Sequence, residues 1–149
     1  MIWILKKYKD LTLDEFHGIL QLRINVFVVE QNCPYPELDN KDKLAYHFFA
    51  YAEEDPAQII AYTRIFKPGD YYKEAAIGRV VVQDDFRKNG LGVELMKKTI
   101  TQTEALFHTK NIKIGAQTYL QKFYESLGFK KTGKEYIEDG IPHIYMIKN

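Results

Sequence analysis

One segment of the chain constrains the fold more than any other, because an apolar strand, a short turn and a glycine-containing helix start follow one another between Ile77 and Ile100. Val80-Val81-Val82 is apolar on both faces, which is typical of a strand in the interior of a sheet. The helix expected from Gly92 to Phe107 carries an apolar stripe at helical spacing: Leu95, Met96, Thr99, Ile100, Thr103 and Phe107. A buried strand that leads directly into an amphipathic helix predicts an α/β chain.

The rest of the chain predicts the element order β-α-β-β-β-α-β-α-β-β. We expect strands at 2–8, 46–52, 58–66, 76–82, 112–117, 131–137 and 142–147, and helices at 12–27, 92–107 and 118–127. Thr12 and Glu15 form a capping-box pattern at the start of the first helix. Turns are expected at 53–57 and at Asp139-Gly140. This order predicts an α/β (α+β) mixed sheet with helices on both faces, and no linker divides residues 1–149, so we expect a single domain.

Composition excludes several classes of protein. The formal net charge is +1 and no run exceeds two basic residues, which argues against nucleic acid as a partner. No stretch approaches the roughly 20 apolar residues of a membrane span, and the apolar start of the chain is too short for a signal peptide. Cys33 is the only cysteine, so an intrachain disulfide is impossible. We therefore expect a protein of the reducing cytoplasm, without a membrane partner.

The chemistry expected at the helix start is anion binding. Glycines let a ligand approach the backbone closely, and the first N–H groups of a helix lack partners within it. The helix dipole adds partial positive charge there, which suits a pyrophosphate. A Walker loop is excluded because Gly133-Lys134 is followed by Glu135, and a dinucleotide fingerprint is excluded because Leu95 stands where its third glycine belongs.

The remaining pattern, Arg-x-x-Gly-x-Gly, resembles the coenzyme A loop of the GNAT acetyltransferase superfamily. It consists of Arg87, Lys88, Asn89, Gly90, Leu91 and Gly92. The strand before it, with Val80, Val81 and Val82, resembles the family strand whose backbone pairs with pantetheine. The resemblance implies a mostly antiparallel sheet of about seven strands and acetyl-CoA as the acyl donor. A glycine-rich turn that merely starts a helix is the alternative interpretation.

A second family segment lies nearer the C-terminus. Phe123-Tyr124-Glu125-Ser126-Leu127-Gly128-Phe129 resembles the Phe-Tyr-x-x-x-Gly-Phe end of a family helix, whose tyrosine usually faces the thioester sulfur. The resemblance implies that Tyr124 is catalytic; packing of Tyr124 in the core is the alternative. The run from Leu22 to Asp42 resembles the ElaA branch of the superfamily, and its first half also resembles acyl-homoserine-lactone synthases.

The function implied by the resemblance is transfer of an acetyl group from acetyl-CoA to a primary amine of a small molecule or peptide by direct attack. Candidate bases that take the amine proton are Glu30, Glu37, Asp39, Asp42, His47 and His143. Arg23, Glu37, Asp39 and His143 are candidate substrate residues, and Arg23 and Arg64 are alternatively partners of the acidic loop. A solvated loop and a structural histidine are the competing interpretations.

Three alternatives stay open at this point. The donor is another acyl group, as in acyl-homoserine-lactone synthases, or the chain is a non-catalytic coenzyme A-binding domain, or it is the acetyltransferase just described. No metal is expected, because Cys33 is single and the four histidines are widely spaced. Relatives in the superfamily commonly form homodimers, and the sequence leaves a homodimer open.

Overall fold

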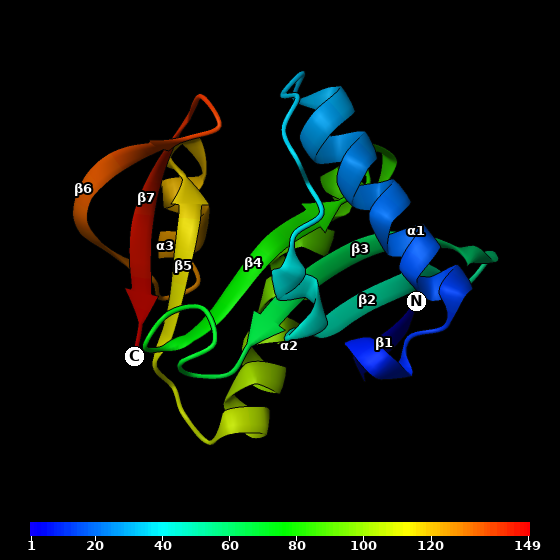
Figure 1. Ribbon diagram of the computed structural model, residues 1–149, viewed down its shortest axis with the longest axis horizontal. Coiled ribbons are helices and arrows are strands. Elements are labelled where there is room, and N and C mark those ends of the chain that lie inside the picture. Colours follow the sequence, from blue (N-terminus) through cyan, green and yellow to red (C-terminus); the bar gives the residue numbers. More distant parts are fainter.

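The computed structural model describes all residues, 1–149, and its centre is one seven-stranded sheet with the strand order β1-β2-β3-β4-β5-β7-β6 (Figure 1). The strands are β1 (Ile2–Lys7), β2 (Tyr46–Ala52), β3 (Asp55–Phe66), β4 (Ala75–Val82), β5 (Ile112–Gln117), β6 (Lys130–Glu138) and β7 (Ile141–Lys148). The helices are α1 (Leu13–Ile24), α2 (Leu91–Phe107) and α3 (Gln121–Glu125). Only β4 and β5 pair in parallel. The expected element order and the mixed, mostly antiparallel sheet are confirmed.

Helices α1 and α2 cover opposite faces of the sheet, as Figure 1 shows. Successive side chains of a strand point to opposite faces, and β2 illustrates this at Phe48 and Phe49. Phe48 packs in the cluster that contains Leu95 of α2, whereas Phe49 packs in the cluster that contains Ile19 of α1. Both phenylalanines are almost fully buried. No helix of the chain is both long and apolar enough to span a bilayer.

Several element boundaries differ from the expectation. The first helix changes after Ile24 into a π-helical segment, Asn25–Glu30, where three valines crowd the backbone. The expected helix 118–127 is a 3₁₀ turn at Thr118–Leu120 followed by the short α3. The turn expected at 53–57 is shorter, because Ala52 pairs with Asp55 and leaves only two residues between the strands.

Strands β4 and β5 diverge, and this divergence positions the site. They pair only at Ala75 with Ile112 and at Ala76 with Lys113, and Figure 1 shows them separating beyond that point. On the other edge of β4, two residues, Arg79 and Val80, oppose the single residue Thr63 of β3, which is a β-bulge. Arg79 has a φ of 51°, an uncommon value for a residue with a side chain. The bulge bends β4 away from β5.

The capping box at the start of α1 provides a test of the fold. The Glu15 amide donates to Thr12 Oγ1 at 3.0 Å, and the Thr12 amide donates to Glu15 Oε1 at 2.8 Å. We expect Thr12→Ala to lower the free energy of unfolding by about 1 kcal/mol. The Glu15 amide loses its acceptor, Thr12 Oγ1, and the reciprocal pair of hydrogen bonds is broken. Urea denaturation measures the change. The exposed Thr101→Ala in α2 is the control, and an equal loss in both variants would contradict this role of the cap.

Candidate functional site

A cavity of about 650 Å³ lies where β4 and β5 diverge. Its walls include 76–82 of β4, 114–117 of β5, residues of the π-helical segment, and side chains from α3 and the β6–β7 hairpin. Most of the lining residues are hydrophobic. A cavity of this size and character at the junction of two half-sheets suits a small molecule or the flexible arm of a larger one.

The start of α2 lies at one end of this cavity. Gly90 is the N-cap residue with a φ of 74°, and no side chain caps the helix. A Cβ on Gly90 would contact nothing within 4 Å, and one on Gly92 would meet only Phe123, at 3.8 Å. The first N–H groups of α2 therefore face open space, and the helix dipole makes this end attractive to an anion.

Of the residues expected in the coenzyme A loop, Val80, Val81, Val82, Arg87 and Gly92 line the cavity. Lys88, Asn89 and Gly90 are exposed beside it, and the Leu91 side chain is buried in the core between the sheet and α2. Leu91 can therefore offer a ligand only its backbone.

Arg87 is held by the protein itself. Its Nε donates to Val82 O at 2.9 Å, and its Nη1 donates to Glu30 Oε2 at 2.6 Å. The guanidinium thus joins the π-helical segment to the strand before α2. An anion at the helix start would share this guanidinium with Glu30.

Tyr124 lines the same cavity from α3. Its ring contacts Phe123 and Phe129 edge-on, and its side chain is almost entirely buried. No side-chain hydrogen bond within the protein involves its hydroxyl, and the residue lines the cavity. Burial raises the pKa of the Tyr124 phenol, and the charge interaction with Tyr119 adds a smaller rise. Tyr124 is therefore a neutral donor whose hydroxyl is available to a ligand.

Three arginines and three carboxylates form a closed charge ring beside the cavity, in the order Arg23, Glu37, Arg79, Asp39, Arg64, Asp42 and back to Arg23. The successive N···O distances are 2.6, 2.9, 3.5, 2.7, 2.9 and 2.8 Å. Each arginine touches two carboxylates and each carboxylate touches two arginines. The ring links α1, the loop after it, β3 and the bulge of β4.

The charge ring shows where several of the expected substrate residues lie. Arg23 and Glu37 are almost fully buried, are paired within the ring and do not line the cavity, and their contact with a substrate stays a prediction. Asp39 does line the cavity. Burial raises the pKa of Asp39, but the hydrogen bond and charge of Arg64 outweigh burial and lower it overall. The expected pairing of Arg23 and Arg64 with the acidic loop is confirmed.

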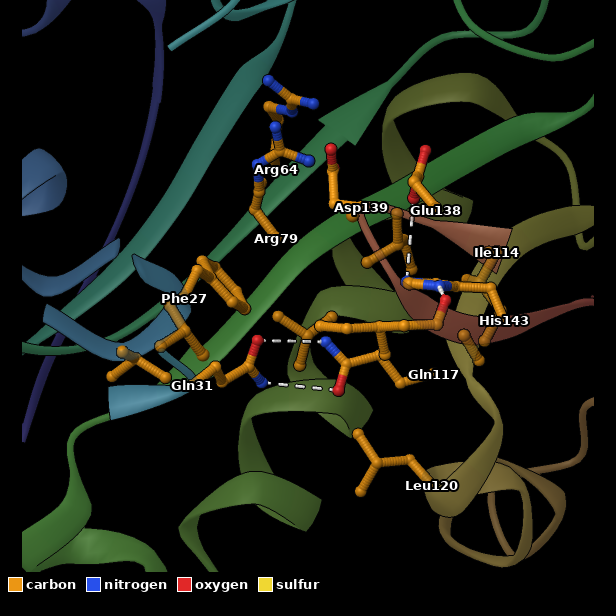
Figure 2. A pocket seen from close by; sticks show the side chains of 18 of the residues that line it. Phe27, Gln31, Arg64, Arg79, Ile114, Gln117, Leu120, Glu138, Asp139 and His143 are labelled. Atoms are coloured by element: carbon orange, nitrogen blue, oxygen red, sulfur yellow. Dashed lines mark hydrogen bonds and ion pairs between the residues drawn. The ribbon is translucent and has the colours of Figure 1, made fainter. Parts of the chain in front are cut away.

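The other candidate bases differ in the freedom of their polar atoms. His47 is buried, with Nδ1 on the Tyr62 hydroxyl at 2.7 Å and Nε2 on Asp42 O at 2.9 Å, so both nitrogens are occupied. Glu30 is paired with Arg87. His143 of β7 lines the cavity, and only its Nδ1 is engaged, donating to Ile141 O at 2.7 Å. Figure 2 shows His143 directed toward Glu138 and the cavity.

The structure adds residues that sequence reasoning did not select. Gln31 and Gln117 exchange two amide hydrogen bonds across the cavity, at 3.4 and 3.3 Å, as Figure 2 shows. Tyr72 and Tyr136 also line it. The only available signal was the alternation of Tyr136 with its neighbours on the last hairpin, which places it on one face. His, Cys, Asp and Glu side chains form no group of three or more that could hold a metal ion.

Removing one carboxylate should open the charge ring. Asp42 is buried and contacts Arg23 and Arg64, so Asp42→Asn leaves two buried guanidinium groups short of negative charge. We expect the free energy of unfolding to fall by about 3 kcal/mol, measured by urea denaturation. Asp85→Asn, at an exposed carboxylate, is the matched control and should change it by less than about 0.5 kcal/mol. If Asp42→Asn left the free energy of unfolding unchanged, the ring would contribute nothing to stability.

Comparison with known proteins assigns the family. A family model described as an acetyltransferase (GNAT) domain matches residues 19–149. Protein ElaA of Escherichia coli is 38% identical over 143 residues, which cover 95% of this chain and 92% of ElaA. The crystal structure of that ElaA has a TM-score of 0.89 at 36% identity and covers 100% of both chains.

Two further crystal structures share the fold. An acyl-CoA N-acyltransferase from Pseudomonas aeruginosa has a TM-score of 0.92 at 38% identity, with 100% of both chains covered. An aminoglycoside 6′-N-acetyltransferase complexed with coenzyme A has a TM-score of 0.67 at 14% identity, covering 97% of this chain and 96% of that one, and shows the fold alone. The resemblance expected from the sequence is confirmed: this chain belongs to the GNAT acetyltransferase family, is similar to ElaA, and its family and fold support an acyl-CoA-dependent N-acyltransferase.

Proposed function

We propose that the protein transfers an acetyl group from acetyl-CoA to a primary amine by direct attack of the amine on the thioester. The observation that carries the proposal is that the uncapped start of α2, the diverging edge of β4 and the unpartnered hydroxyl of Tyr124 all border one cavity. These features would serve the pyrophosphate, the pantetheine and the thioester sulfur of one donor. We also propose a cytoplasmic location, in agreement with the lone Cys33.

The donor would be held mainly by backbone groups. Val80 to Val82 would pair with the pantetheine amides, and the N–H groups at the start of α2 would bind the pyrophosphate. Gly90 and Gly92 suit this task because neither has a side chain between the backbone and the ligand. Arg87, already near this end, would add charge once the pyrophosphate competes with Glu30 for its guanidinium.

Tyr124 would stabilise the leaving thiolate by donating a hydrogen bond. Even an exposed phenol, with a pKa of about 10, is a weaker acid than a thiol near 8.5, so full proton transfer is uphill by about 2 kcal/mol. Burial raises the pKa of Tyr124 and increases that cost. Donation of a hydrogen bond toward developing charge does not require transfer, and it is most effective in a site that excludes water.

Gly92→Val tests the donor site. A Cβ at this position meets only Phe123, at 3.8 Å, so we expect the variant to fold, with its methyl groups where the backbone borders the cavity. We expect the Kd for coenzyme A, measured by isothermal titration calorimetry, to rise by about tenfold or more, the equivalent of 1.4 kcal/mol. Val93→Ala, at the exposed next residue, should bind normally. If Gly92→Val bound coenzyme A as tightly as the parent protein, the donor would not bind at the start of α2.

Tyr124→Phe tests the chemistry separately from binding. We expect kcat with acetyl-CoA and a reactive amine to fall by about 100-fold, while the Kd for acetyl-CoA stays within about twofold. Release of the free thiol is the measurement, and octanoyl-CoA in parallel reports the preference for the acyl chain. Tyr51→Phe, in β2 away from the cavity, is the control. A Tyr124→Phe protein with the turnover of the parent would leave Tyr124 a packing role only.

A further inference from the structure

The part of the cavity formed by β5, β6 and β7 contains polar groups that the donor site does not use. Gly115 of β5 pairs with Tyr145 of β7. A Cβ at Gly115 would lie 2.5 Å from the Tyr136 hydroxyl oxygen and 3.2 Å from the Tyr72 hydroxyl oxygen. The glycine therefore lets two phenol oxygens, from distant parts of the chain, converge above one point of β5.

These phenols are neutral groups with aromatic faces. Burial raises the pKa of Tyr72 and of Tyr136, and the nearby Glu138 charge adds to the effect for Tyr136. The Tyr136 ring stacks on His143 at 5.5 Å and on Tyr145 at 4.4 Å between centroids. Ring faces and neutral oxygen lone pairs attract a cation without pairing with it as a carboxylate does.

The hydrogen bond made by His143 determines which of its ring nitrogens can act as a base. A carbonyl oxygen can only accept a hydrogen bond, so the contact of 2.7 Å with Ile141 O places the proton on Nδ1. The neutral ring then has its lone pair on Nε2, which lies 3.6 Å from Glu138 Oε2. That distance is too long for a hydrogen bond, but it is short enough to stabilise an imidazolium.

The charge ring, by contrast, offers nothing to an acceptor carboxylate. Each guanidinium in it already touches two carboxylates, and only Arg79, whose side chain is 21% exposed, reaches solvent to any extent. Glu138, at 56% side-chain exposure, is the carboxylate beside His143 that no arginine pairs. Glu138 therefore favours a positive charge beside His143, while Lys113 Nζ already lies over the Tyr72 and Tyr145 rings, at 4.8 and 4.6 Å from their centroids.

We propose that Tyr72, Tyr136, His143 and Glu138 form the acceptor subsite, which takes a primary ammonium with no carboxylate on the same carbon, and that Nε2 of His143 removes its proton. The proposal rests on the proposed function, because the acceptor must lie beside the thioester in the same cavity. The subsite lies next to Gln117, which pairs with His143 in the sheet. In this assignment His143 is a catalytic residue, and the two tyrosines position the amine.

The reaction balances with the groups present. One proton passes from the ammonium to Nε2 of His143 and then to water past the exposed Glu138. The freed lone pair forms the C–N bond as the C–S bond breaks, and Tyr124 donates a hydrogen bond to the departing sulfur. The second proton on nitrogen ends on that sulfur, which gives the amide, the free thiol and one released proton.

The first test compares acceptors that differ only beside the amine: tyramine, tyrosinamide and tyrosine, then 3-methylbutylamine, leucinamide and leucine. The amide matches the carboxylate in bulk without its charge. We expect kcat/KM with acetyl-CoA to be at least about 100-fold lower for each amino acid than for its amide. Calorimetric titration of each compound into the protein loaded with coenzyme A should give the same order of affinity, and this readout does not depend on turnover.

Equal use of tyrosine and tyrosinamide would overturn the acceptor class, and so would a failure of all four carboxylate-free amines to bind the loaded protein at millimolar concentration. The proposed function has a separate test, since coenzyme A binding and turnover of any amine are measured independently of this order. If the enzyme acetylated amino acids best, the proposed function would stand and the assignment of this acceptor subsite would be wrong.

The second test uses His143→Gln, with the exposed His17→Gln on α1 as the control. At pH 7 almost all of a primary amine is protonated, since its pKa lies near 10, so we expect kcat to fall by about 100-fold with the affinity for tyramine nearly unchanged. The deficit should shrink as the pH approaches 10, where the amine loses its proton unaided. The titratable groups that contact His143 are Tyr136 and Glu138, both on β6.

A deficit in His143→Gln that is the same at every pH would indicate a structural role and overturn the assignment of the base. Glu138→Gln covers the case in which His143→Gln does not fold, because Glu138 is largely exposed. We expect Glu138→Gln to raise KM for tyramine several-fold and to leave the Kd for coenzyme A unchanged. An unaltered KM for tyramine would contradict the subsite.

Discussion

The charge ring is the interaction on which the site depends, because it joins four segments that the chain itself keeps far apart. Its members come from α1, the loop 31–43, β3 and β4. Four of the six charges, those of Arg23, Glu37, Asp42 and Arg64, are almost fully buried, which is costly unless each finds partners of opposite sign, and here every member has two. A closed ring tolerates burial for this reason, whereas removal of any one member leaves its neighbours uncompensated. The ring therefore fixes the loop over the sheet in one arrangement.

The same ring holds the β-bulge open. Arg79 takes a positive φ at the bulge, a conformation that costs free energy, and its guanidinium donates to Glu37 at 2.9 Å. This contact stabilises Arg79, and with it the extra residue of β4, in the bulged conformation. Because the bulge bends β4 away from β5, the sheet divides into two halves that meet only at their first residues. The cavity, and the exposed backbone edge proposed to hold the donor, follow from that division.

The sequence predicted the parts of the site that depend on local structure. The capping box, the strand Val80–Val82 and the helix start at 87–92 are each encoded within a few neighbouring residues, and their structures agree with the expectation. The charge ring could not be predicted as a ring, because its closure depends on contacts between residues up to 42 positions apart in the chain, as between Glu37 and Arg79. The tautomer of His143 depends on a carbonyl that only the hairpin geometry brings near it.

Under the proposed mechanism, the two sides of the cavity have different tasks in proton transfer: Tyr124 stabilises the thiolate, and His143 accepts the amine proton. Burial makes Tyr124 a poor acid, so it can stabilise a thiolate by hydrogen bonding but cannot readily supply the proton that the thiol finally carries. That proton must then come from the attacking amine, which has one to give only after a first has left. A base on the acceptor side is needed for that first proton, and His143 is the candidate whose second nitrogen is free. The raised pKa of Tyr124 and the free Nε2 of His143 are thus two requirements of one reaction.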